Sequence, residues 1–202
     1  MSVLTKRPLK SALFIAMAIG LAGCATTRDI NPNAAIHYDA TYDFADKKKI
    51  VDHLSQNLLQ FVDRNNVQPV VISYGIGNET SEHINTAGIS DDIRLALVQS
   101  GKYQLINEDQ RANISTEAKF QNTGTVPVSQ RIVKGRQLGA DYVLAGTLRS
   151  IVKDQPRQFR LSKKKLVHYS LNLELTDTDT GAVSWADKVE IARESSRPIF
   201  GW

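Results

Sequence analysis

The feature that most constrains the fold is a strict alternation of apolar and polar residues near the end of the chain. The apolar positions are Val167, Tyr169, Leu171, Leu173 and Leu175, and the polar positions between them are His168, Ser170, Asn172 and Glu174. Successive side chains of a strand point to opposite faces, so this pattern predicts a strand with one buried and one solvated face. After a polar turn at 176–181, the alternation continues with Val183, Trp185, Val189 and Ile191. The two segments are expected to pair as an antiparallel hairpin.

Helices and further strands are predicted before this hairpin. The expected helices run from Ala45 to about Asn65-Asn66 and over 86–99, 108–120 and 128–138, and the expected strands over 69–74, 102–106 and 142–152. The apolar stripe of the first helix consists of Ile50, Leu54, Leu58 and Phe61, and Asp46 is its expected N-cap. Gly75 and Gly77 are expected to end strand 69–74, and strand 142–152 begins apolar on both faces, as a buried central strand does.

These elements predict the α+β fold class. The order of helices and strands favours a mixed sheet that ends in an antiparallel three-strand meander, flanked by about four helices. No internal repeat or low-complexity tract interrupts the pattern.

The N-terminal segment has the composition of a signal peptide. Lys6, Arg7 and Lys10 precede an uncharged, mostly apolar run of 12 residues, 11–22. As a helix this run reaches about 18 Å, which is shorter than the roughly 30 Å of a bilayer's hydrocarbon core. Removal of this segment leaves 22 of the 25 basic side chains against 21 acidic ones. A near-neutral mature chain argues against nucleic acid as a partner.

A lipid attachment motif follows. Leu21, Ala22, Gly23 and Cys24 resemble the bacterial lipobox, in which the cysteine is acylated and becomes the first residue after cleavage. Cys24 is the only cysteine, so it has no disulfide partner, and acylation explains its presence. Ala25, in place of Asp, indicates sorting to the outer membrane, with the chain facing the periplasm. The expected organisation is a signal peptide at 1–23, a lipidated N-terminus and short linker at 24–44, and a globular domain at 45–202.

The sequence shows no catalytic, metal-binding or cofactor-binding motif. The histidines at 37, 53, 83 and 168 lie far apart, and no second cysteine can assist them. Gly75-Ile76-Gly77 follows a strand as a phosphate loop does, but Thr80 stands at the third glycine position and no Walker lysine follows. We therefore expect no catalytic residue, no metal, no cofactor and no small-molecule substrate.

Three motifs resemble the LpoB family. Residues 78–86 (NETSEHINT) with 97–103 (LVQSGKY) are similar to the family's N-x-T-S-x-H-I-D-T and L-x-x-S-G-K-F stretch. Residues 139–146 (GADYVLAG) resemble its G-A-D-Y-x-L-x-G strand, and residues 180–187 (TGAVSWAD) resemble its T-G-x-x-x-W-x-D hairpin. The motifs occur in matching order between about residues 50 and 193, behind the lipobox.

The resemblance implies a binding module and not an enzyme. Members of this family are outer-membrane lipoproteins that bind a small regulatory domain of a bifunctional (class A) penicillin-binding protein and stimulate peptidoglycan synthesis. Familiar members have a long Pro-rich tether, whereas the linker here has about twenty residues with Pro32 as its only proline. The alternative is an accessory lipoprotein in the assembly of an outer-membrane appendage related to curli or flagella.

The expected partner surface is the loop between the first two meander strands, at 153–165. This loop contains Arg157, Phe159 and Arg160, followed by Lys163, Lys164 and Lys165. Arginine and aromatic residues are enriched at the centres of protein interfaces, although a solvated charged loop has the same composition. The chain ends with Phe200 and Trp202, which are expected to fold back on the domain or to dock into a partner.

Overall fold

The computed structural model describes residues 28–61, 68–132, 139–155 and 162–198. The compact unit that contains the sheet begins at Ala35, so part of the expected linker belongs to it. Within the described residues, no helix is long and apolar enough to cross a membrane.

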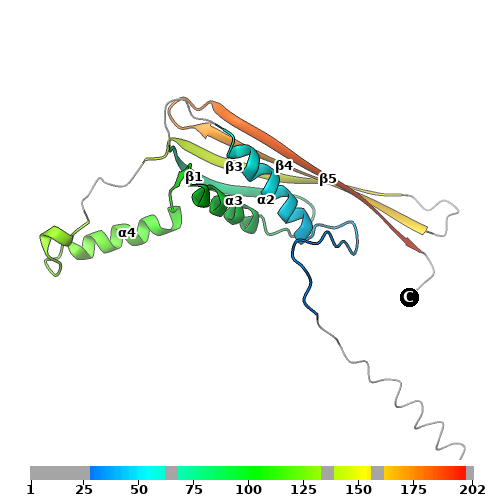
Figure 1. The fold of residues 1–202 in the computed structure, drawn as a ribbon, viewed down its shortest axis with the longest axis horizontal. Coiled ribbons are helices and arrows are strands. Elements are labelled where there is room, and N and C mark those ends of the chain that lie inside the picture. The colour runs from blue at the N-terminus through cyan, green and yellow to red at the C-terminus, as the bar shows by residue number, and fades with distance from the viewer. Residues whose placement is uncertain (1–27, 62–67, 133–138, 156–161, 199–202) are drawn as a thin grey trace, which may run out of the picture. The chain divides into compact units, whose positions relative to one another are not determined.

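A single five-stranded sheet forms the base of this unit (Figure 1). Its strands are β1 (Val70–Glu79), β2 (Gln104–Leu105), β3 (Tyr142–Asp154), β4 (Ser162–Asp177) and β5 (Val183–Pro198), in the spatial order β2-β1-β3-β4-β5. β1 pairs in parallel with β2 and β3, whereas β3, β4 and β5 form an antiparallel meander. The predicted α+β class, the mixed sheet and the closing meander are confirmed.

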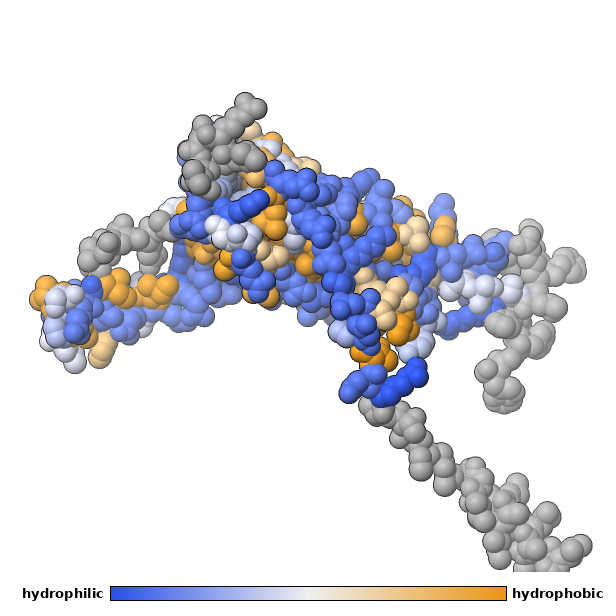
Figure 2. Space-filling view, in the orientation of Figure 1, coloured by the Kyte–Doolittle hydropathy of each residue, from blue (hydrophilic) through white to orange (hydrophobic). Residues whose placement is uncertain are grey.

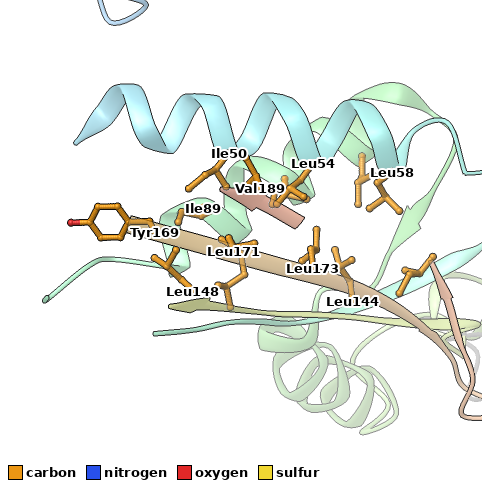
Figure 3. Packing of buried hydrophobic residues seen from close by; sticks show 14 of the residues in the cluster. Ile50, Leu54, Leu58, Ile89, Leu144, Leu148, Tyr169, Leu171, Leu173 and Val189 are labelled. Carbon is orange, nitrogen blue, oxygen red and sulfur yellow. The ribbon is translucent and has the colours of Figure 1, made fainter. Parts of the chain in front are cut away.

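Two helices cover one face of the sheet. α2 (Phe44–Leu58) contacts β5, α3 (Ala87–Ser100) contacts β1 and β2, and the two helices contact each other. Their inward residues are Ile50, Leu54 and Leu58 on α2 and Ile89, Ile93 and Leu97 on α3, all fully buried. Figure 3 shows Ile50, Leu54, Leu58 and Ile89 against Leu148, Tyr169, Leu171 and Leu173 of the sheet. Burial of each large apolar side chain stabilises the fold by about 1.5–3 kcal/mol.

A third helix, α4 (Glu108–Gln121), contributes no buried residue, and Figure 2 shows apolar residues on the surface in its region. It confirms the helix predicted over 108–120. Its N-cap is Asn107, whose side chain accepts the N–H of Gln110, and two acidic residues lie in its first turn. The predicted helix over 128–138 is wrong at its start, because only a 3₁₀ turn, η1 (Val128–Gln130), forms before Arg131 becomes extended. Residues 133–138 lie outside the described part.

The first helix begins earlier and ends earlier than expected. Asp43, and not Asp46, is the N-cap: its side chain accepts the N–H of Ala45 and of Asp46. The Asp46 side chain accepts the Asp43 N–H in return, which completes a capping box. Phe61 packs against the core from beyond the helix end, and the expected stop at Asn65-Asn66 lies outside the described residues.

β1 continues through the two glycines that were expected to end it. Gly75 has a φ of 81° and lies at a register shift between Ser73 and Gly75, so one extra residue is accommodated as a bulge. Beyond the bulge, Ile76 is buried against the core and pairs with Gly146. β3 also differs from expectation. Only alternate residues such as Tyr142 and Leu144 are buried at its start, because α2 and α3 cover one face.

Gly146, in one of the three family-like motifs, lies in a crowded part of the sheet. A Cβ at this position would lie 2.7 Å from the backbone oxygen of Asn172 and 3.1 Å from the Leu173 side chain. The oxygen belongs to the neighbouring strand and cannot move away without displacing β4. The motif glycine is therefore needed for the close approach of β3 and β4.

We predict that Gly146→Ala lowers the free energy of unfolding by about 1–3 kcal/mol, because the added methyl overpacks the strand pair. The matched control is Gly77→Ala on β1, where a Cβ would meet nothing closer than 3.8 Å. Urea denaturation of both variants provides the measurement. Equal midpoints for the two variants would contradict the steric explanation.

Candidate partner-binding surface

The meander strands are longer than the helices that cover them. β4 and β5 each have 16 residues, which span about 53 Å, whereas the 15 residues of α2 span about 22 Å. The far end of the meander consequently extends beyond α2 (Figure 1). We call this end the distal ribbon and define it as 151–154 of β3, 162–168 of β4 and 192–198 of β5, which pair with one another.

The face of the distal ribbon opposite the helices carries exposed apolar side chains. Ile151 lies directly across from His168, and Leu166 across from both Lys153 and Glu194. Ile151 is 59% and Leu166 43% exposed. We call this surface, formed by Ile151, Leu166 and their cross-strand neighbours, the open face. Two apolar side chains in adjacent rows, framed by charges, have the composition of an interface core with a polar rim.

The lysines of the predicted basic loop do not form one patch. The loop is shorter than expected, because 153–154 and 162–165 belong to β3 and β4. Strand alternation places Lys164 on the open face, where it contacts Glu194 at 2.6 Å. Lys163 and Lys165 lie on the helix-covered face. Arg157, Phe159 and Arg160 lie outside the described residues, so their role in partner binding stays a prediction.

Ile151 and Leu166 were absent from the predicted partner surface, although a signal for them was available. Ile151 is followed by Val152, and Leu166 by Val167. Two adjacent apolar residues in a strand point to opposite faces, so each pair must place one apolar side chain on the solvated face. The strict alternation of β4 begins only at Val167, and Leu166, immediately before it, is the exception.

The proximal border of the distal ribbon is fixed by a cluster of ion pairs. Arg193 of β5 contacts Asp46 at 2.5 Å and Asp43 at 3.3 Å, and it also donates to the backbone oxygen of Thr41. His37 lies 2.5 Å from Asp43. In addition, the ring of Tyr42 packs edge-on against Tyr169, with centroids 5.8 Å apart. These contacts hold residues 37–46 against the sheet.

The same cluster contains the one group of metal-ligand types among the described residues. The ligand atoms of His37, Asp43 and Asp46 lie within 4.8 Å of one another. However, the guanidinium of Arg193 already contacts both carboxylates and supplies the compensating charge. The geometry is therefore that of a buried salt bridge and not of a metal centre.

The pKa of Asp43 reflects this setting. Burial alone would raise it, but hydrogen bonds from His37 and from the N–H of Asp46, together with the charge of Arg193, hold the pKa of Asp43 below its usual value. A carboxyl whose folded pKa is depressed stabilises the fold above its unfolded pKa. This contribution is lost as the pH falls through the folded value.

The first family-like motif shapes the loop between β1 and α3. The Asn78 side chain donates to the backbone oxygens of Glu82 and Ile84 and accepts from Thr80. The Glu82 carboxylate then accepts the hydroxyl of Tyr169 at 2.8 Å. Burial and this carboxylate raise the pKa of Tyr169. The motif thus ties the loop to the core.

We predict that Asp46→Ala lowers the free energy of unfolding by about 1.5–3 kcal/mol, because it removes the more buried of the two carboxylates that contact Arg193 and half of the capping box. Asp52→Ala serves as the control: Asp52 forms an exposed pair with Lys48 at 2.9 Å, and its loss is expected to cost below about 0.5 kcal/mol. Thermal and urea unfolding measure both effects. A loss at Asp46 no larger than at Asp52 would show that the ion-pair cluster does not hold residues 37–46 to the sheet.

Comparison with known proteins identifies relatives of the chain. The family model described as "Peptidoglycan-synthase activator LpoB" matches residues 46–191. No curated protein sequence matches. The solved C-terminal domain of LpoB from Salmonella enterica is 18% identical, with 72% of this chain and 98% of that one covered and a TM-score of 0.44. The C-terminal domain of LpoB from Escherichia coli is 17% identical, with 73% of this chain and 99% of that one covered and a TM-score of 0.45. Lipoprotein GNA1162 from Neisseria meningitidis is 19% identical, with 63% of this chain and 84% of that one covered and a TM-score of 0.38.

Proposed function

The chain belongs to the LpoB family of peptidoglycan-synthase activators, and from this premise we propose that it binds and activates a class A penicillin-binding protein from the inner side of the outer membrane. The observation that carries the proposal is the family match over 46–191, which runs from α2 to β5. Because the family consists of activators, the chain is a regulator and not an enzyme. The alternative role in appendage assembly is not favoured by this match.

The open face is the surface that we assign to the synthase. Its exposed Ile151 and Leu166 supply apolar area, and the neighbouring Arg149, Lys153 and Lys164 supply cationic rim positions. Activation requires that the domain bind the active conformation of the synthase more tightly than the inactive one, since only a difference in affinity shifts such an equilibrium. A stiff ribbon of paired strands suits this task because its side chains are held in fixed register.

A short tether limits where this contact takes place. Residues 35–43 belong to the folded unit, which leaves ten residues, 25–34, between the proposed lipid anchor and the domain. Fully extended, ten residues span about 35 Å. The partner domain of the synthase must accordingly approach the outer membrane to within the sum of this reach and the length of the ribbon.

We predict that the purified full-length protein in neutral detergent accelerates glycan polymerisation by a class A penicillin-binding protein and leaves a monofunctional transpeptidase unaffected. Ile151→Asp and Leu166→Asp should each weaken half-maximal stimulation about tenfold, since a charge replaces apolar contact area. Val183→Asp is the matched control, because Val183 is an equally exposed apolar residue at the opposite end of the meander.

Each outcome of this assay bears on a different part of the proposal. Absence of stimulation by the unaltered protein refutes the class A partner. Normal stimulation by Ile151→Asp and Leu166→Asp refutes the open face as the contact while the partner stands. Unchanged melting temperatures in the three variants establish that any loss comes from the surface and not from unfolding.

We propose that Cys24 anchors the protein, with Leu21, Ala22 and Gly23 as its recognition sequence; these four residues lie outside the described part. Cys24→Ser is predicted to remove the protein from the outer-membrane fraction, because several acyl chains are needed for stable attachment. Ala25→Ser keeps the cysteine and serves as the control. Membrane fractionation at high salt provides the measurement. Persistence of Cys24→Ser in the outer membrane would contradict lipid anchoring.

A further inference from the structure

A second surface of the distal ribbon lies opposite the open face, on the side of the sheet that carries α2 and α3. There, a pocket of about 190 Å³ opens between the strands and the segment at 39–41. Asp39, Thr41, Lys163, Lys165, Ser195 and Arg197 contribute to its lining. We call it the basic pocket.

The cations of the basic pocket are placed where they repel one another. Lys163 of β4 lies directly opposite Arg197 of β5, and Lys165 follows two residues along on the same face. Like charges at directly opposed positions of an antiparallel pair destabilise the sheet. Neither Lys163 nor Lys165 forms an ion pair with any residue in the part of the chain that the structure describes. A bound anion would relieve this repulsion.

The acidic groups beside these cations are only partly available to neutralise them. Asp39 accepts the N–H of Thr41 at 2.8 Å and also its hydroxyl, and it contacts Arg197 at 3.4 Å. These hydrogen bonds from Thr41, with smaller contributions from Arg197 and Lys165, keep the pKa of Asp39 below its usual value. Asp154 lies across from Lys165 on β3. The pocket thus contains three cations, on Lys163, Lys165 and Arg197, and two carboxylates, on Asp39 and Asp154. Its net charge is positive.

This mixture matches a ligand that carries both carboxylates and an ammonium group. Lysine ammonium groups and an arginine guanidinium bind carboxylates through charge-assisted hydrogen bonds, and Asp39 and Asp154 suit an ammonium. A phosphate ion would bind to the cations, but both carboxylates would repel it. Short peptides that contain a diamino dicarboxylic acid have the matching pattern of charges, and such peptides are the stems of peptidoglycan.

We propose that the basic pocket binds the stem peptide of peptidoglycan through its carboxylates, so that the activator is held on the polymer that its partner extends. The choice of ligand rests on the family's role in peptidoglycan synthesis. It does not depend on the open face or on the identity of the synthase. Binding to the polymer near the membrane would also raise the local concentration of the domain at sites of synthesis.

The test is an NMR titration of the full-length protein in neutral detergent. The probe is a soluble disaccharide–tetrapeptide fragment of peptidoglycan, and the comparison ligands are the same fragment with amidated carboxylates and inorganic phosphate. The variant is Lys163→Ser combined with Arg197→Ser. Lys164→Ser is the matched control, because it removes a lysine from the same strand on the opposite face, where it pairs with Glu194.

We expect saturable shifts at 39–41, 163–165 and 195–197 with the acidic fragment, and an affinity about tenfold lower for the double variant. Lys164→Ser should bind as the unaltered protein does. The proposal is overturned if the acidic fragment gives no saturable shifts, if the amidated fragment or phosphate binds equally well, or if Lys164→Ser weakens binding as much as the double variant. If the double variant melts at a lower temperature, Lys163→Gln alone replaces it.

Stimulation of the synthase by the same variants separates this proposal from the proposed function. Lys163→Ser with Arg197→Ser leaves the open face intact, so stimulation in solution is expected to be unchanged. Lost fragment binding with normal stimulation supports the basic pocket. Normal fragment binding in Ile151→Asp supports two independent surfaces, whether or not the synthase assignment holds.

Discussion

The packing of α2 and α3 on the odd-numbered side chains of β4 is the contact on which the other features depend. Tyr169, Leu171, Leu173 and Leu175 are nearly inaccessible to solvent, and β3 and β5 pair with β4 on its two sides over most of its length. A shift of β4 by one residue would turn this apolar row outward, so the buried face fixes the register of the entire meander. The register in turn decides which lysine faces which side of the distal ribbon.

The limited length of the helices leaves the basic pocket uncovered, whereas the open face lies on the side of the sheet that no described helix covers. α2 covers less than half of the length of β4, and the ion pairs of Arg193 with Asp43 and Asp46 mark the end of the covered part. Beyond this border, the sheet has no helix to bury its apolar residues. A ribbon of three paired strands keeps its shape without such a cover because its backbone groups are paired. It can therefore present one face to a protein and the other to a charged ligand.

Much of the fold was predictable because the strongest patterns come from one-sided burial. The alternation of β4, the inward positions Ile50, Leu54 and Leu58 of α2 and the helix over 86–99 each follow from local chemistry and were predicted correctly. The passage of β1 through Gly75 was not predicted, because a bulge depends on the neighbouring strand and not on the glycine itself. Asp46 was predicted to be the cap on its position alone. Its partner Arg193 lies 147 residues away, and no local pattern connects the two.

The functional surfaces were less predictable for the same reason. The run Lys163-Lys164-Lys165 has the appearance of one basic patch, but strand geometry divides it between two faces. The cross-strand pair of Lys163 and Arg197 follows from the register of β4 and β5, which sequence spacing alone does not determine. Leu166 is apolar on a face that is otherwise polar. This departure from the alternation is visible in the sequence, but its meaning depends on the absence of a covering helix.

The central claim is that the open face of the distal ribbon contacts a class A penicillin-binding protein. Hydrogen–deuterium exchange of the full-length protein, measured with and without the purified synthase, tests it most directly. The account predicts slower exchange over 151–154 and 162–168 when the synthase is bound, with α3 and α4 unchanged. Protection confined to α3, α4 or the loop at 80–86, with the distal ribbon unaffected, would contradict it.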